Sequence, residues 1–178
     1  LGCLMSCFAL APIPWSFVED CFPSQEPDEL TTIRDSELVS RSLLRQAGDD
    51  LYQLHPLIHQ FLGMQRDQSD WGDELKQVFC REMVSIAKTI PQTPVRTQIL
   101  ELTPAIPHLA EVATTWKNWL TDEDLTWPFI GLGRFYQGQG AYNAAEPWFE
   151  MCLEAVSDRQ GESHPDVATS LNNLALLY

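Results

Sequence analysis

Residues 138–154 read GQGAYNAAEPWFEMCLE, and residues 161–178 read GESHPDVATSLNNLALLY. The twelve residues 125–136, just before the first stretch, align with residues 167–178 at a shift of 42 positions. Only two of the twelve pairs are identical, but apolar and small residues coincide at the positions expected to face inward. A helix pair that recurs with a period of about 20–50 residues is typical of a solenoid.

The pattern of large and small residues makes the repeat more specific. The first helix has the order large, Leu, small, Tyr, and the second has small, aromatic, small. The residues are Phe129, Leu132, Gly133 and Tyr136, followed by Ala145, Phe149 and Cys152. We expect Gly133 and Ala145 to let the helices approach closely, while Phe149 and Tyr136 fill the space beside them. The unit resembles a tetratricopeptide (TPR) repeat of the 42-residue kind found in kinesin light chains and many bacterial regulators.

The TPR resemblance implies a binding groove and a longer array. In TPR repeats, fixed positions on the first helix line a concave face that binds a protein or peptide. Carried over residue by residue, these are Trp127, Ile130, Arg134, Gln137, Thr169, Asn172 and Asn173. An Asn amide can both donate to and accept from a peptide backbone, although Asn172 and Asn173 also fit ordinary solvated positions. Because a solenoid helix without its partner exposes an apolar face, we expect further repeats beyond Tyr178.

The first 67 residues combine short helical segments with a hairpin. Helical patterns cover residues 16–22 and the segment from residue 28 onward. Turn residues at 47–50 separate two short apolar stretches, and a helix resumes at Pro56, which is tolerated in a first turn. Three helices and a small hairpin in this order indicate a winged-helix arrangement.

The hairpin region also resembles a known family. Residues 42–58 resemble the winged-helix segment of signal-transducing NTPases of the NB-ARC and NACHT-like (STAND) type. In that family a Met-His-Asp motif follows the hairpin strand, and its His contacts the β-phosphate of bound ADP. Leu54, His55 and Pro56 stand at that place here, so the resemblance implies that His55 senses nucleotide held by an upstream NTPase domain of the same polypeptide. No GxxxxGK[ST] loop occurs in these residues, so ADP or ATP would bind outside this chain. The alternative is a structural His between hairpin and helix.

Between these regions, residues 68–120 have a helical pattern. One apolar face runs from Trp71 to Ile90 and ends at Pro91. Thr103 and Pro104 suit the N-cap and first position of a second helix. That helix would bury Ile106, Leu109, Val112 and Ala113. The sequence therefore predicts a mainly α chain: a winged-helix module at 1–67, a helical hairpin at 68–120 and TPR repeats at 121–178.

Composition excludes several classes of function. The 11 Lys and Arg residues against 25 Asp and Glu give a net charge of −14, which disfavours nucleic acid and anionic lipid. No apolar run reaches the ~18 residues needed to span a membrane. The five cysteines form no CxxC pair, so we expect free thiols in a reducing cytoplasm rather than disulfides or a zinc site.

No set of residues predicts catalysis. Ser163, His164 and Asp166 lie too close together to form a triad, which is assembled across a fold. His55 and His59 share helical spacing but have no third metal ligand. We therefore expect no enzyme activity, metal or cofactor within this chain.

The expected function is protein–protein interaction and regulation within a multidomain NTPase. The TPR groove would bind a partner protein, and the winged helix would couple it to the nucleotide switch. Two alternatives stay open: a winged-helix transcription regulator with a TPR sensor, and a stand-alone TPR adaptor. The first is disfavoured because its recognition helix, at 28–45, is too acidic to enter a DNA groove.

Overall fold

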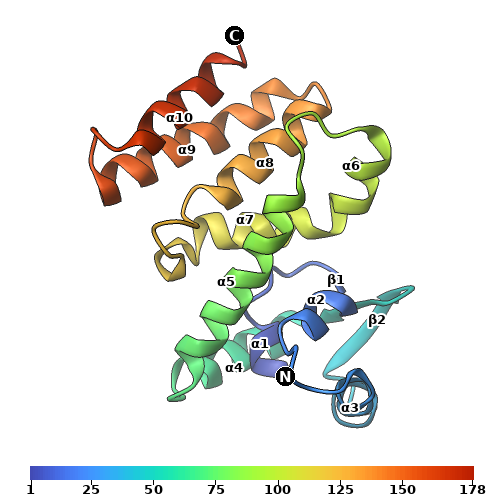
Figure 1. Cartoon of the computed structure of the whole chain (residues 1–178). Coiled ribbons are helices and arrows are strands. Elements are labelled where there is room, and N and C mark those ends of the chain that lie inside the picture. The colour runs from blue at the N-terminus through green and yellow to red at the C-terminus, as the bar shows by residue number, and fades with distance from the viewer. The chain divides into compact units, whose positions relative to one another are not determined.

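Helices dominate the chain in the computed structural model, which describes all 178 residues, and the strands form one small sheet. This confirms the predicted mainly α class with a small hairpin. The chain divides into two units, Leu1–Glu82 and Met83–Tyr178, and the boundary falls within the long helix α5, Gly72–Thr89 (Figure 1). The predicted division into three parts stays a prediction.

The sheet of the first unit is antiparallel, with strand order β1-β3-β2. Strands β2 (Leu44–Gly48) and β3 (Leu51–Leu54) form the predicted hairpin. Asp50, in the turn between them, has a φ of +54°, a conformation that Asp tolerates better than most residues. The sequence did not predict β1 (Ile13–Pro14), because two residues are too few to show an alternating pattern.

Five helical segments precede α5 in this unit. They are α1 (Gly2–Met5), α2 (Trp15–Asp20), α3 (Pro27–Ile33), the π-helical η1 (Arg34–Val39) and α4 (Pro56–Asp67). Their shared core is apolar, and the rings of Phe8 and Phe79 lie 4.6 Å apart between centroids.

A buried cation joins α4 to the segment after α1. Arg66 is only 4% exposed, and its Nη1 donates to the carbonyl oxygen of Ser6 at 2.9 Å. Its Nε and Nη2 donate to the two carboxylate oxygens of Asp67, and Lys76 pairs with the same carboxylate. These interactions lower the pKa of Asp67, with the hydrogen bond from Arg66 as the largest cause. Burial of a charge is tolerated only with such pairing.

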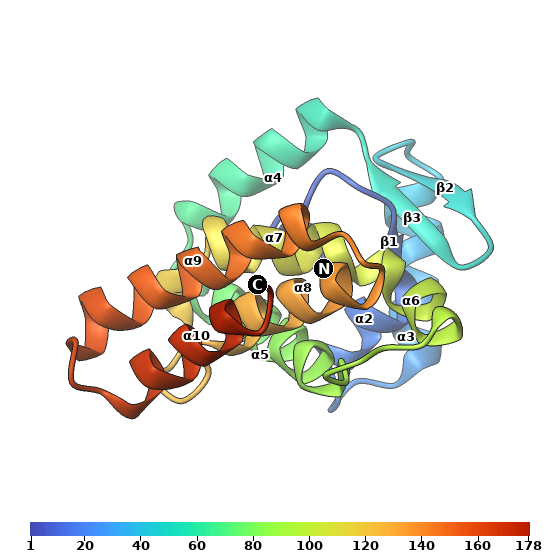
Figure 2. The same cartoon turned by 90° about the horizontal axis from the view of Figure 1, so that it is seen from above.

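The second unit contains the end of α5 and a series of helices. These are α6 (Arg96–Leu102), the 3₁₀ turns η2 (Thr103–Ala105) and η3 (Lys117–Trp119), α7 (Ile106–Thr114), α8 (Trp127–Gly138), α9 (Tyr142–Gln160) and α10 (Pro165–Ala175). α7 packs against α8, α8 against α9, and α9 against α10. The last three lie side by side in both views (Figures 1 and 2).

The second helix of the predicted hairpin differs at its start. α7 buries the four apolar residues expected of it. Thr103, however, is not its N-cap, because its hydroxyl donates to the carbonyl of Ile99 at 2.6 Å and the residue ends α6. α7 begins at Ile106 after Ala105. The sequence missed α6, whose seven residues bury no side chain and so lack an apolar face.

Candidate protein-binding face

Glycine allows α8 and α9 to approach closely. A Cβ atom added at Gly133 would lie 2.3 Å from Cζ of Phe149, well inside van der Waals contact. Phe149 is 2% exposed and Ala145 is fully buried. The predicted contact between Gly133 and Phe149 is therefore confirmed, and Ala145 is buried as expected.

The contact between α9 and α10 also uses small side chains. Sγ of Cys152 lies 3.4 Å from Oγ of Ser170, and both residues are buried. Burial raises the pKa of the Cys152 thiol to about 11, so it stays protonated. α10 begins at Pro165, and Nδ1 of His164 accepts a hydrogen bond from the backbone N–H of Asp166 at 3.3 Å. His164 thus caps the N-terminus of α10.

The segment that forms these three helices was compared with known protein families. Residues 124–178 match the tetratricopeptide repeat family. The TPR match covers α8, α9 and α10. TPR domains generally bind proteins or peptides. Comparison of the chain with curated proteins and with solved structures found no match in either.

The structure separates the predicted groove residues by exposure. Thr169 and Asn172 on α10 are exposed, and Asn173 is partly exposed. On α8, Trp127, Arg134 and Gln137 are partly exposed, whereas Ile130 is only 6% exposed and belongs to the core. The structure therefore brings polar side chains together on α10 but not an open row along α8.

The C-terminal end of α5 covers part of α8. A Cβ at Gly131 would lie 3.2 Å from Cβ of Ala87 and from Cδ1 of Ile90. Nη1 of Arg134 donates to the carbonyl oxygen of Ile90 at 3.2 Å, and burial lowers the pKa of Arg134. This side chain therefore closes the end of α5 instead of projecting freely into a groove.

Two further contacts extend this cover. Nζ of Lys88 lies 2.7 Å from Oδ1 of Asp124 and 5.7 Å from the ring centroid of Trp127. A Cβ at Gly138 would lie 2.3 Å from Cγ of Pro94. One sequence signal could have indicated this packing: glycines stand at 131 and 138, two turns apart on one face of α8.

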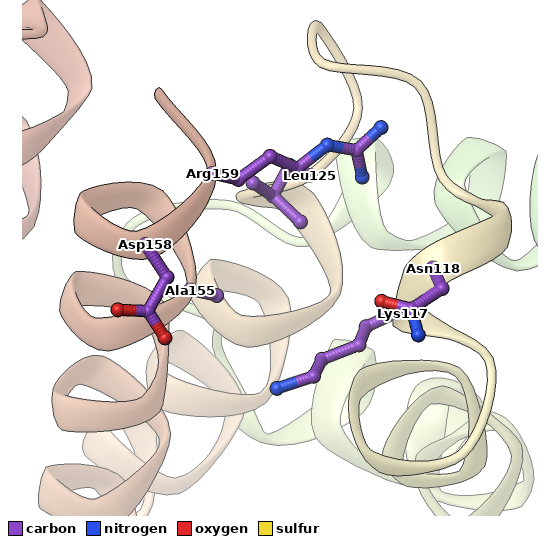
Figure 3. A pocket seen from close by; sticks show the side chains of 6 residues that line it. All are labelled: Lys117, Asn118, Leu125, Ala155, Asp158 and Arg159. Carbon is purple, nitrogen blue, oxygen red and sulfur yellow. The ribbon is translucent and has the colours of Figure 1, made fainter. Parts of the chain in front are cut away.

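A small hollow in the same unit shows no catalytic set. It encloses about 220 Å³ and is lined by Lys117, Asn118, Leu125, Ala155, Asp158 and Arg159. The side chains of Lys117 and Arg159 extend across it from opposite sides (Figure 3). Arg159 is held there by Oδ1 of Asp122 at 2.7 Å and by the carbonyl of Leu120. No residue that lines the hollow is a nucleophile activated by a base.

His55 begins α4 as a helix cap. Its Nδ1 accepts a hydrogen bond from the backbone N–H of Leu57 at 3.2 Å, and Pro56 occupies the first turn. The side chain is exposed and lines a hollow of about 340 Å³ together with Ser42, Leu43, Arg45, Gln53, Leu54 and Pro56. The predicted contact of His55 with nucleotide stays a prediction.

The other residues weighed for metal or redox chemistry have structural environments. His59 is turned to the carbonyl of Phe8, 2.8 Å from its Nε2, and no cluster of three or more potential ligands could hold a metal ion. All five cysteines are free. Burial raises the pKa of Cys7 to about 11 and of Cys80 to about 12. None of the helices is both long and apolar enough to cross a membrane.

Proposed function

We propose that this chain is the interaction and regulatory part of a signalling NTPase of the STAND type. Its TPR helices bind a partner protein, and its first unit, a winged-helix-like module, couples that event to a nucleotide switch in a domain of the same polypeptide. The observation that carries the binding role is the TPR repeat at residues 124–178 with exposed polar side chains on α10. The five free thiols support a location in the reducing cytoplasm.

The binding face that we propose centres on α10. Asn172 and Thr169 are exposed, one turn apart, and Asn173 lies beside them. Amide groups can pair with both the N–H and the C=O of a peptide backbone. Arg134 and Trp127 on α8 are already engaged by the end of α5, so they contribute at the edge of the face.

The nucleotide-coupling role rests on the first unit. Four helical segments and a hairpin precede His55, which is exposed beside a hollow. An exposed imidazole at the junction of β3 and α4 is free to meet a phosphate held by another domain. The chain has no phosphate-binding loop of its own, so it supplies the sensor and not the catalytic machinery.

The binding role is tested with peptides selected on the wild-type chain. The double variant Asn172→Ala, Asn173→Ala should weaken binding of the selected peptides at least about tenfold, because it removes paired amide contacts. Asn143→Ala is the matched control, since Asn143 is also exposed but lies on α9. Equal affinities for wild type and double variant would refute the α10 face.

The coupling role is tested in the full-length polypeptide, after the upstream coding sequence has been read for a GxxxxGK[ST] loop. His55→Ala should accelerate ADP release. His164→Ala is the matched control, because both histidines cap a His-Pro helix start through Nδ1. Loss of a cap alone would then affect both variants. If the two variants release ADP at the wild-type rate, His55 does not sense nucleotide.

The contacts of the arginines in the segment at 28–45 argue against the transcription-regulator alternative. Arg34 pairs with Asp35 and lies over the rings of Trp15 and Tyr52, 4.8 and 4.6 Å from their centroids. Arg41 pairs with Glu37. The cations of this segment are therefore engaged within the chain and do not form a row for phosphates.

A further inference from the structure

α4 has a second apolar face that nothing in the chain covers. Leu57, Phe61 and Met64 are 69%, 55% and 52% exposed. Their spacing of four and three residues places them along one side of the helix. The opposite side is the buried one, where Leu62 lies against Gly2 and Arg66 is bonded to Ser6. A helix that is apolar on both sides is expected to be covered on both.

This exposed face is also free of charge. Residues 51–65 contain no Asp, Glu, Lys or Arg, although charged residues make up 20% of the chain. The longer uncharged run at 1–18 contains many of the buried core residues of its unit, as expected for a run without charges. On α4 the exposed apolar residues are bordered by Gln60 and Gln65. A face built to receive a basic or acidic partner would carry the opposite charge at its edges.

We propose that this neutral face of α4 binds the same face of a second copy of the chain. The positions Leu57, Phe61 and Met64 are nearly symmetric about Phe61. When two copies of α4 cross antiparallel on a two-fold axis, each Phe61 meets its own counterpart, and Leu57 meets Met64 of the second copy. Such a contact is self-complementary, as a two-fold interface requires. The antiparallel helix dipoles favour the same orientation.

The charge of the chain supports this occupant. Two copies that each carry a net charge of −14 repel one another. The repulsion opposes close approach least where neither surface is charged. Three half-exposed apolar side chains supply on the order of 300 Å² per copy, against about 800 Å² per partner in a stable interface. The expected association is therefore weak, at protein concentrations of roughly tens to hundreds of micromolar. It does not depend on the proposed TPR or nucleotide roles.

Sedimentation velocity of the 178-residue chain tests the proposal. The weight-average mass should rise with concentration over a range of about 10 to 500 µM. The rise should be steeper at about 500 mM salt than at about 50 mM, because salt screens the repulsion between like-charged copies. Contact with an oppositely charged partner surface would show the reverse dependence.

Substitutions at the symmetric position make the test specific. Phe61→Glu and Phe61→Lys should each be monomeric, because two like charges would meet across the axis. A mixture of the two variants should associate again. Leu100→Glu is the control, since Leu100 is 65% exposed on α6 and its substitution should leave association unchanged. Phe61 is exposed, so folding should be retained; circular dichroism checks this, and Leu57→Glu is a second variant with the same expected loss.

Three results would overturn the proposal. The first is a monomer at every concentration and both salt levels. The second is association that Phe61→Glu does not weaken, or that Leu100→Glu weakens equally. The third is failure of the mixed Glu and Lys variants to associate while each alone is folded. None of these results bears on the TPR face, because peptide binding through α10 is measured separately.

Discussion

A single methyl group at position 133 tests the close contact between α8 and α9. In an open helix interior, replacing Gly by Ala stabilises a protein by about 1 kcal/mol. At Gly133, the added Cβ would lie 2.3, 2.4 and 2.8 Å from three carbons of the Phe149 ring. Carbon atoms in favourable contact are about 3.5 Å apart, so the closest overlap is about 1.2 Å. The ring is only 2% exposed, so it must shift within the core to relieve the overlap.

The clash should outweigh the gain in helix propensity. Overpacking of a filled core costs about 1–3 kcal/mol, and an overlap with three ring atoms belongs at the upper end. After the propensity gain is subtracted, Gly133→Ala should lower the free energy of unfolding by about 1–2 kcal/mol. Adding Phe149→Leu removes ring atoms from the contact, so the double variant should lose less stability than the sum of the single changes.

Urea unfolding followed by circular dichroism measures these effects. Gly63→Ala is the matched control, because Gly63 lies inside α4 and its added Cβ would meet only Nη2 of Arg66, at 3.7 Å. It should be neutral or stabilising by up to about 1 kcal/mol. If Gly133→Ala is as stable as wild type, or if the double variant shows strict additivity, the small residue at 133 does not set the approach of the two helices.

Three further variants examine other contacts. Burial, with a neighbouring aspartate, raises the pKa of Glu82 to about 7. Between about pH 4.5 and 7 the folded chain keeps a proton on Glu82 that the unfolded chain releases, so the free energy of unfolding falls as pH rises through this range. In thermal unfolding, Glu82→Gln should therefore be more stable than wild type at about pH 8 and equal to it near pH 4. Arg66→Ala should cost about 3 kcal/mol in urea unfolding because it leaves buried polar groups unpaired, whereas Arg41→Ala, in an exposed pair, should cost less than about 1 kcal/mol. Arg134→Ala should speed amide hydrogen exchange at the end of α5, since the carbonyl oxygen of Ile90 loses the hydrogen bond that Arg134 donates and the helix end can open more often; unchanged exchange would mean that this bond does not hold the helix end.

The features predicted from the sequence are those that a local pattern specifies. The turn at 47–50 carries residues suited to its backbone, and the hairpin forms there. The periodic spacing of apolar residues placed α5 and α7. The 42-residue shift placed α8, α9 and α10, because small and large residues must alternate where helices meet.

The features that the sequence did not predict depend on contacts between distant residues. β1 exists because Ile13 pairs with Tyr52, 39 positions away, and its own two residues have no strand pattern. The end of α5 covers α8 partly because Arg134 donates a hydrogen bond to the carbonyl oxygen of Ile90, 44 positions earlier in the chain. Arg134 has the position of a groove residue within its own helix, and only the neighbouring helix reveals that it is engaged.

The two His-Pro pairs show why a local motif fixes structure more readily than function. His55 and His164 each stand before a Pro, and each accepts a hydrogen bond from the N–H two residues later. This shared chemistry follows from the dipeptide, because Pro presets the first helical turn and leaves the imidazole to cap it. Their surroundings differ: His164 lies within 3.7 Å of Asp166 in a turn between repeats, whereas His55 lines an open hollow. The nucleotide-sensing role that we propose therefore applies to His55 alone. The pair of alanine variants separates the capping role common to both histidines from any role specific to one.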